Sequence, residues 1–432
     1  MTRKLRYIHA ADIHLGSIPH INYIDNVYKE ELIREVVYKS FEKIIDDAIK
    51  YNVDFVLISG DIFDGDSYSI KAYKFFKSQC EKLENIKLYF VCGNHDPMIN
   101  EKYKMELSNN VFTFESDKPK IYNYEKDGKV IARIIGQSYR ARSESRSIWK
   151  EYNLPKDEVF NIALLHTSMD GNKRYAPCTI GDLKTKECIN YWALGHIHKQ
   201  QIFKDENQVI AFPGIPQGRD FGELESGGYY LVDIVDDNID VQFIKTSYLV
   251  FKKIKISIDK YKENLVNISD LEDLIEDKVN TLLEEDNDLV KVYVIQWILK
   301  GRGDIHSILN DQSEEDLEEL IKEINSNFNY GKILAITDSI LVRTSRAMSQ
   351  IQNFEENNKF FHEIDNMIQN YMNNDELKEE LVKNLGKIWD IKNDHENINE
   401  EKFLLNEEML TDIVSEAKNL IIDELLKKLV IE

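Results

Sequence analysis

The sequence predicts an α/β fold in which two facing sheets have helices on their outer sides. Before residue 97, apolar runs typical of buried parallel strands alternate with amphipathic helical segments. Alternating strands joined by short turns follow as far as residue 248, and the chain beyond residue 345 is helical and acidic. We therefore expect a first domain at 1–248, a small α+β domain at 249–345 and a helical region at 346–432.

The first segment predicts a strand–helix–strand–helix–strand unit. Its strands are apolar runs that end in polar clusters, and its helices carry apolar residues at spacings of three and four. The elements in chain order are 6–11, 32–49, 54–59, 70–83 and 87–92. Because such units are right-handed, we expect the three strands to be parallel.

The next segment predicts a hairpin at 121–136, with its turn at 126–128, and a strand at 160–165. Four later strands alternate and are linked by short turns, so a more antiparallel second sheet is expected. They are 191–194, 208–212, 228–234 and 241–244.

After residue 248 the pattern is β-α-β-α-β, with strands at 250–258, 290–300 and 332–343 and helices at 268–283 and 313–324. Amphipathic helices are then expected at 351–372, 375–389 and 400–430. These acidic helices are read either as a solvated bundle or as a surface that docks on a partner's coiled coil.

The composition of the chain excludes some classes of function. The chain has 432 residues and a net charge of −22, and the excess acid is concentrated after residue 250, so charge gives no positive evidence for a nucleic-acid partner. No apolar run is long enough to span a membrane, and the N-terminus lacks the features of a signal peptide. We therefore expect a cytoplasmic protein without membrane contact. The four cysteines show no C-x-x-C spacing, which argues against a zinc knuckle or a disulfide framework.

Metal-capable residues follow five of the predicted strands. In open α/β sheets ligands bind outside the carboxyl ends of the strands, so these residues are expected along one rim. The candidate ligands are Asp12, His14, Asp61, Asn94, His166, His196 and His198. Imidazole and carboxylate together suit Mn, Fe or Zn.

This set is sufficient for two divalent cations that share the carboxylate of Asp61. The first cation would take Asp12, His14, Asp61 and His198, and the second Asp61, Asn94, His166 and His196. Such a pair holds a nucleophilic hydroxide and clamps both oxygens of an in-line displacement. His95 is expected to contact the substrate phosphate, where it would protonate the leaving oxygen or stabilise the developing charge.

Each motif alone is ordinary, because a D-x-H or H-x-H at a strand end is usually a turn or a cap. The signal is the complete set in this order. The motifs are A-A-D-I-H-L at 10–15, S-G-D-I-F-D at 59–64, G-N-H-D at 93–96, L-L-H at 164–166, Y-A-P-C at 175–178 and Y-W-A-L-G-H-I-H at 191–198, together with Q-G-R at 217–219 and G-R-G at 301–303. The set resembles the calcineurin-like metallophosphoesterases, and among them the SbcD-type DNA-repair exonuclease subunits of the YhaO-like branch.

The resemblance covers roughly residues 1–340 and implies a four-layer αββα sandwich followed by a capping domain. It implies hydrolysis of DNA phosphodiesters with two divalent metal ions, Mn²⁺ first and Fe, Zn or Mg as alternatives. The expected activity is a 3′–5′ exonuclease, with single-stranded DNA endonuclease as a variant. An SMC-like coiled-coil ATPase is the expected partner, and the chain itself contains no P-loop. Whether the chain forms a homodimer stays open.

Five further residues are singled out beside the ligand set. Some relatives carry a histidine where Asp64 stands, so Asp64 is expected to orient neighbouring ligands. Arg219 is read either as a bidentate contact to the substrate phosphate or as a structural salt bridge. Arg140, Arg142 and Arg146 are read either as contacts to a DNA backbone or as a solvated loop.

Two alternatives to a nuclease remain. One is a phosphatase or nucleotide phosphodiesterase of the same fold. Protein phosphatases of this kind carry G-D-x-x-D-R-G and G-N-H-E, whereas this chain has Gly65-Asp66 after Asp64 and ends the third motif in Asp96. The other is a scaffold with an idle metal site, which a missing ligand would have favoured.

Overall fold

The structure is a computed structural model. It describes residues 4–24, 27–65, 69–97, 107–169, 173–236, 238–261, 265–284, 289–327, 333–347, 359–385, 389–391, 403–405 and most of 409–421. Contacts divide the chain into two compact units. The first is Met1–Lys252 with Asp286–Val294 and Tyr330–Ile336, and the second is Lys253–Glu285, Ile295–Asn329 and Thr337–Glu432. The three-domain division expected above stays a prediction. None of the helices in the described part is both long and apolar enough to cross a membrane.

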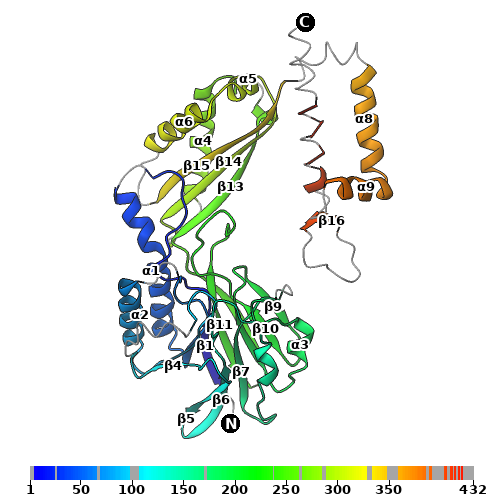
Figure 1. Cartoon of the computed structure of the whole chain (residues 1–432). Coiled ribbons are helices and arrows are strands. Elements are labelled where there is room, and N and C mark those ends of the chain that lie inside the picture. Colours follow the sequence, from blue (N-terminus) through cyan, green and yellow to red (C-terminus); the bar gives the residue numbers. More distant parts are fainter. Residues whose placement is uncertain are drawn as a thin grey trace. The chain divides into compact units, whose positions relative to one another are not determined.

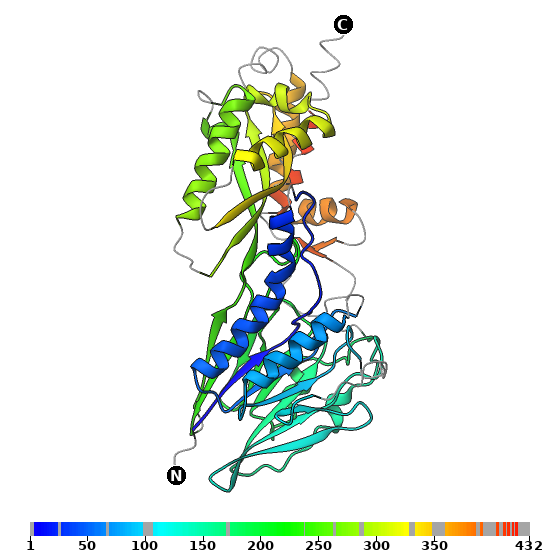
Figure 2. The same cartoon turned by 90° about the vertical axis from the view of Figure 1, so that its left-hand side faces the viewer.

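The first sheet has the strand order β12-β11-β1-β2-β3-β4. Its strands are β1 (Lys4–Ala10), β2 (Phe55–Ser59), β3 (Lys87–Val91), β4 (Val111–Thr113), β11 (Gly228–Val235) and β12 (Asn238–Lys245). β1, β2, β3 and β4 run parallel, which confirms the predicted unit. The helices α1 (Val27–Lys50) and α2 (Ile70–Lys82) connect these strands and lie together on one face of the sheet (Figure 2).

The second sheet has the order β5-β6-β7-β8-β10-β9. Its strands are β5 (Lys120–Lys126), β6 (Lys129–Gly136), β7 (Phe160–His166), β8 (Tyr191–Gly195), β9 (Gln201–Lys204) and β10 (Val209–Phe212). The β5–β6 hairpin is antiparallel as predicted.

The expected antiparallel character of the later strands is wrong for β8 and β10 and confirmed for β11 and β12. β6, β7, β8 and β10 run parallel, and the antiparallel hairpin β11–β12 joins the first sheet beside β1. The physical reason is burial. All residues of β8 and β10 are buried, as in parallel strands that are covered on both faces.

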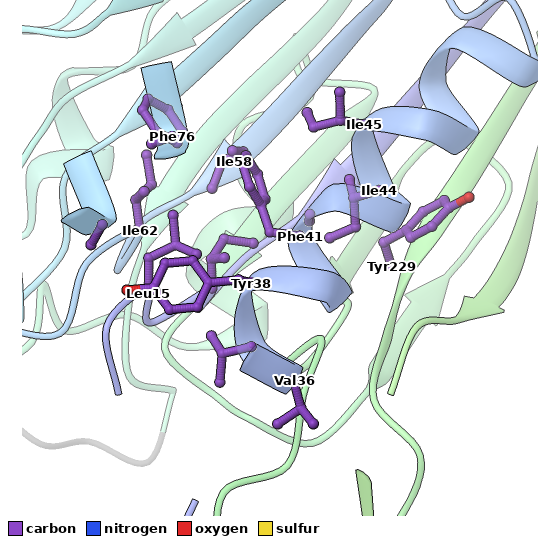
Figure 3. Packing of buried hydrophobic residues seen from close by; sticks show 14 of the residues in the cluster. Leu15, Val36, Tyr38, Phe41, Ile44, Ile45, Ile58, Ile62, Phe76 and Tyr229 are labelled. Carbon is purple, nitrogen blue, oxygen red and sulfur yellow. The ribbon is translucent and has the colours of Figure 1, made fainter. Parts of the chain in front are cut away.

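Side-chain alternation along β2 separates two cores. Val56 and Ile58 face the core formed with α1 and α2, where Phe41 lies at the centre (Figure 3). Phe55 and Leu57 face the core between the two sheets. Burying each such side chain contributes about 1.5–3 kcal/mol.

The outer face of the second sheet packs against α3 (Ile180–Lys184), the 3-10 helix η2 (Ile148–Glu151) and loops. α1 and α2 therefore lie on one side of the sheets and α3 on the other (Figure 1). The expected four-layer αββα sandwich is confirmed.

A third sheet has the order β13-β14-β15. Its elements are β13 (Leu249–Ser257), η3 (Ile258–Tyr261), α4 (Ile268–Leu283), β14 (Val292–Arg302), α5 (Ile305–Asn310), α6 (Glu314–Asn327) and β15 (Leu334–Ser345). A capping box of Asn267 and Asp270 begins α4. The predicted β-α-β-α-β pattern is present, with α5 as an addition.

The helices α8 (Lys359–Met372) and α9 (Asp375–Leu385) agree with the predicted helical region, although residues 351–358 lie outside the described part. Two boundaries were wrong. β16 (Trp389–Ile391) begins at the last residue of the helix expected at 375–389, and it pairs in parallel with β17 (Phe403–Leu405), which lies within the helix expected at 400–430. Short apolar runs do not distinguish strand from helix by period alone, and here backbone pairing between distant segments decides.

Candidate metal centre

The candidate ligands lie at the carboxyl ends of five strands. Asp12 and His14 follow β1, Asp61 follows β2, and Asn94 and His95 follow β3. His166 is the last residue of β7, and His196 and His198 follow β8. Parallel strands end at a common rim, and the distances below bring all eight residues together across the two sheets.

The backbone in this region is locally strained. Asp12, His14, Asp61 and His196 all have positive φ, at 52°, 50°, 50° and 97°. Hydrogen bonds hold the loops after β1 and β2 against each other, since the N–H of Asp12 donates to Gly60 O (3.0 Å) and that of His14 to Asp61 O (3.0 Å). Such left-handed residues persist only where their surroundings enforce them, and they cluster at functional sites.

Three glycines next to candidate ligands allow this close approach. A Cβ on Gly60 would collide with the ring of His166, and Gly60 also has φ +99°. A Cβ on Gly93 would strike Asp61 Oδ1, and one on Gly195 would strike Ser59 O. Space therefore requires glycine at all three positions, and backbone conformation requires it at Gly60 as well.

Asp12, His14 and His198 form the first cluster and offer ligand atoms within 4.8 Å of one another. Nε2 of His14 lies 3.3 Å from Nε2 of His198, so two lone-pair atoms face each other unless a proton or a cation lies between them. Asp12 and His14 are buried. Burial and the charge of Arg219 hold the pKa of His14 well below its usual range, which favours the neutral form that binds a metal.

Asp61, His166 and His196 form the second cluster. Nδ1 of His166 faces the carbonyl oxygen of Ser59 (2.9 Å) and therefore carries the hydrogen of the neutral ring. Its Nε2 then faces two oxygens, Asn94 Oδ1 at 2.9 Å and Asp61 Oδ2 at 3.3 Å. Asn94 Oδ1 also lies 3.0 Å from Nδ1 of His196.

The ionisable groups of this second cluster favour a bound cation. Burial opposes a charge on His166, but Asp61 and Asp12 raise the pKa of its imidazole to about 9. Burial likewise opposes ionisation of Asp61, yet His166 and His14 hold the pKa of this carboxyl well below its usual range. The buried carboxyl groups of Asp61 and Asp12 therefore favour positive charge at this position, which either a proton on His166 or a bound cation supplies. This donor set fits Mn, Fe or Zn.

Asp61 also groups with His14 and His95, so it belongs to two of the three donor groups in the described part of the chain. The N–H of His95 donates to Asp61 Oδ1 (2.8 Å). This position between the clusters is where a bridging carboxylate is needed. The assignment of each ligand to a metal stays a prediction.

His95 differs from the candidate ligands in its exposure. Its side chain is 40% exposed, and its ring lies edge-on to His14 with the ring centroids 4.9 Å apart. Asp64 Oδ1 lies 2.9 Å from Nδ1 of His95. Asp64 was expected to orient a ligand, but its hydrogen bond holds His95 instead.

Two carboxylates at the site were not predicted from the sequence. Asp96 accepts hydrogen bonds from the backbone N–H groups of Ile62 (2.7 Å), Phe63 (3.2 Å) and Gly93 (2.8 Å), and so ties the loop after β2 to the loop after β3. Because Asp96 belongs to the motif G-N-H-D, its role at the site could have been predicted. Glu223 lies 2.6 Å from Nδ1 of His198, and no local motif indicates it.

Arg140, Arg146 and Arg219 pair with acids. Arg219 donates to Glu223, as the salt-bridge alternative expects, whereas its contact to a phosphate stays a prediction. Arg140 pairs with Asp117, and Arg146 pairs with Glu144.

Two mixed sheets between helices, with a rim of histidine, aspartate and asparagine, define a hydrolase fold suited to metal-dependent chemistry. The family model described as calcineurin-like phosphoesterase matches residues 5–200. A Bacillus subtilis protein named uncharacterized metallophosphoesterase YhaO is 33% identical over 334 residues, covering 74% of this chain and 80% of that protein. The chain therefore belongs to the calcineurin-like metallophosphoesterases, and the resemblance noted above is confirmed.

Other relatives are more distant. A Methanococcus maripaludis protein named DNA double-strand break repair protein Mre11 is 26% identical over 367 residues, covering 76% of this chain and 94% of that protein. Among solved structures, the purple acid phosphatase PPD1 from yellow lupin is 12% identical with a TM-score of 0.37, covering 57% of this chain and 52% of that chain.

Proposed function

We propose that this chain is a two-metal-dependent DNA nuclease that hydrolyses phosphodiester bonds in DNA repair. The observation that carries the proposal is the position of Asp61 in two donor groups, next to the partly exposed His95. The Methanococcus relative is named a DNA double-strand break repair protein, which supports DNA as the substrate. The proposed polarity is 3′–5′ exonuclease, with endonuclease activity on single strands as a variant, and the proposed partner is an SMC-like coiled-coil ATPase.

Two divalent cations, Mn²⁺ in the first instance, would occupy the two clusters. Asp12, His14, Asp61 and His198 would hold the first, and Asp61, Asn94, His166 and His196 the second. When bound, the cations supply positive charge that polarises the phosphate and acidifies an attacking water.

The protein's own part in the reaction centres on His95. The hydrogen bond to Asp64 raises the pKa of His95, and Asp61 raises it further although burial opposes this. A protonated imidazole that is partly exposed can donate its proton to the leaving oxygen. General acid catalysis of this kind is worth about 10²–10⁴-fold.

The test is degradation of end-labelled double-stranded DNA and of circular single-stranded DNA by purified protein with Mn²⁺. Asp61→Asn is expected to lose both metal and activity. His95→Gln is expected to keep its metal and to lose about 10²–10⁴-fold in rate, whereas the exposed His20→Gln should match the wild type. Absence of DNA cleavage with any divalent metal, while metal analysis finds two cations per chain, would refute the proposal.

A nucleotide phosphodiesterase or phosphatase is the second candidate. A cavity of about 560 Å³ opens beside His198 and Glu223, with Pro213, Ile215 and Phe243 in its wall. This volume suits a small ligand. Small phosphate esters and diesters hydrolysed with a higher kcat/KM than DNA would favour this candidate.

A further inference from the structure

We propose that Glu223 is a positioning residue for His198 and that it selectively sets the affinity of one of two cation sites, the cluster of Asp12, His14 and His198. The inference rests on the proposed function in one respect, that the two clusters bind cations. It adds a residue that no strand-end motif contains, and it predicts an asymmetry between the two sites.

The first step is the tautomer of His198. Its Nδ1 lies 2.6 Å from Oε1 of Glu223, and an ionised carboxylate can only accept a hydrogen bond. Nδ1 therefore carries the hydrogen, and the lone pair of the neutral ring is on Nε2. That atom faces Nε2 of His14 at 3.3 Å, inside the cluster. Glu223 thus directs the ligand atom of His198 toward the cation position.

The second step is the fixation of Glu223 itself. The backbone N–H of Arg219 donates to Oε2 (2.8 Å), and Nη2 of Arg219 donates to Oε1 (3.3 Å). The Glu223 side chain is only 12% exposed. Its two oxygens thus face three donor groups, on His198 and Arg219, which is the environment of an ionised carboxylate.

The third step is the contrast with the other cluster. The hydrogen on Nδ1 of His166 goes to a backbone carbonyl, that of Ser59, at 2.9 Å. A carboxylate partner increases the basicity of an imidazole ligand more than a neutral carbonyl does, because it stabilises positive charge on the ring. Loss of Glu223 should therefore weaken the cluster that contains His198 and leave the cluster that contains His166 unchanged.

The experiment is calorimetric titration of Mn²⁺ alone into the metal-free full chain, for the wild type, Glu223→Gln and Glu225→Gln. Glu225 is the matched control because it is an exposed glutamate in the same loop, two residues further on. In Glu223→Gln, one of two sites should weaken by about 10–100-fold while the other keeps its affinity. Glu225→Gln should bind as the wild type does.

A second variant covers the case in which Glu223→Gln fails to fold, judged by circular dichroism and urea unfolding without metal. Glu223→Asp keeps the charge but is one methylene shorter, so it should weaken the same single site. A merely structural role would lower stability without this selectivity. DNA cleavage adds a further readout, since raising Mn²⁺ should restore the rate of the Glu223 variants.

Three outcomes of this experiment distinguish failure of the inference from failure of the proposed function. Selective weakening of one site supports the inference. Two unchanged sites, or equal weakening of both, in the variant that folds would overturn it while the proposed function stands. A wild-type chain that binds fewer than two Mn²⁺ at saturation would overturn the proposed function, and the inference with it.

Discussion

His95 and Asp64 are joined by a 2.9 Å contact between Nδ1 and Oδ1, across the loops that follow β3 and β2. The side chains are 40% and 20% exposed, so the pair lies at the edge of the buried cluster and within reach of solvent. The hydrogen bond raises the pKa of His95 and lowers the pKa of Asp64. The candidate acid of the site is therefore oriented and kept protonated by one carboxylate.

Replacing Asp64 by asparagine should change the pH dependence of hydrolysis. The raised pKa keeps His95 protonated to higher pH, and protonation is lost as pH rises through that pKa. Asparagine removes the negative charge that raises the pKa of His95. The alkaline decline of the rate should therefore begin at a lower pH in the variant than in the wild type. Below the ordinary histidine pKa of about 6.5 the two proteins should converge.

The measurement is the pH–rate profile of a chromogenic phosphodiester at saturating Mn²⁺. Asp117→Asn is the control, because Asp117 is exposed and pairs with Arg140. An alkaline limb that stays in place in Asp64→Asn would contradict this role of Asp64.

Replacing Gly60 by alanine should destabilise the site more than an ordinary glycine substitution. Gly60 has φ +99°, and its new Cβ would collide with the ring of His166. Gly128 has φ +71° in the β5–β6 turn, with open space around its Cβ position, so Gly128→Ala isolates the conformational cost of about 1 kcal/mol. Urea unfolding should show a clearly larger loss in the free energy of unfolding for Gly60→Ala than for Gly128→Ala. Equal losses would mean that the loop after β2 rearranges to admit the new Cβ.

The packing of α1 predicts a large effect at Phe41. This side chain is fully buried, and its ring stacks on Phe76 with the centroids 5.6 Å apart (Figure 3). Phe41→Ala should lower the free energy of unfolding by about 3–5 kcal/mol through lost burial and a cavity. Ile49 lies on the same helix and is 45% exposed, so Ile49→Ala should cost no more than about 0.5 kcal/mol. Comparable losses in urea unfolding would show that α1 does not pack as described.

Removal of divalent cations should lower thermal stability. Asp12 and Asp61 are both buried at the site, and a bound cation offsets the repulsion between their charges. At one hundred times the dissociation constant, a ligand specific to the folded state adds about 2.7 kcal/mol. Thermal unfolding with Mn²⁺ and with chelator should therefore differ in the wild type and much less in Asp61→Asn. A wild-type melting temperature that does not change with Mn²⁺ would argue against metal binding at this site.

Local patterns predicted most of the elements of the sandwich. β1, β2 and β3 are apolar runs that end abruptly at polar residues, and α1 carries one continuous apolar stripe, so both periods are visible over a few residues. The candidate ligands were predicted by the same logic. Each lies within a few residues of a strand end, and parallel strands bring their ends to one rim.

Pairings between distant segments were not predictable in this way. The hairpin β11–β12 joins the first sheet because β11 lies antiparallel to β1, more than two hundred residues away in the chain. An alternating strand shows which face is buried and leaves open which strand it meets. The pair β16–β17 was missed for the same reason.

The sequence by itself determined the α/β class, the order of the strands and helices before residue 97 and the polar residues at the strand ends, because each depends on neighbours along the chain. Only the tertiary structure decided that Asp64 holds His95, that Asp96 joins two loops and that Glu223 faces His198. A hydrogen bond between side chains depends on distance and direction in space, and Glu223 reaches His198 only after the loop beyond β10 has folded back to the rim.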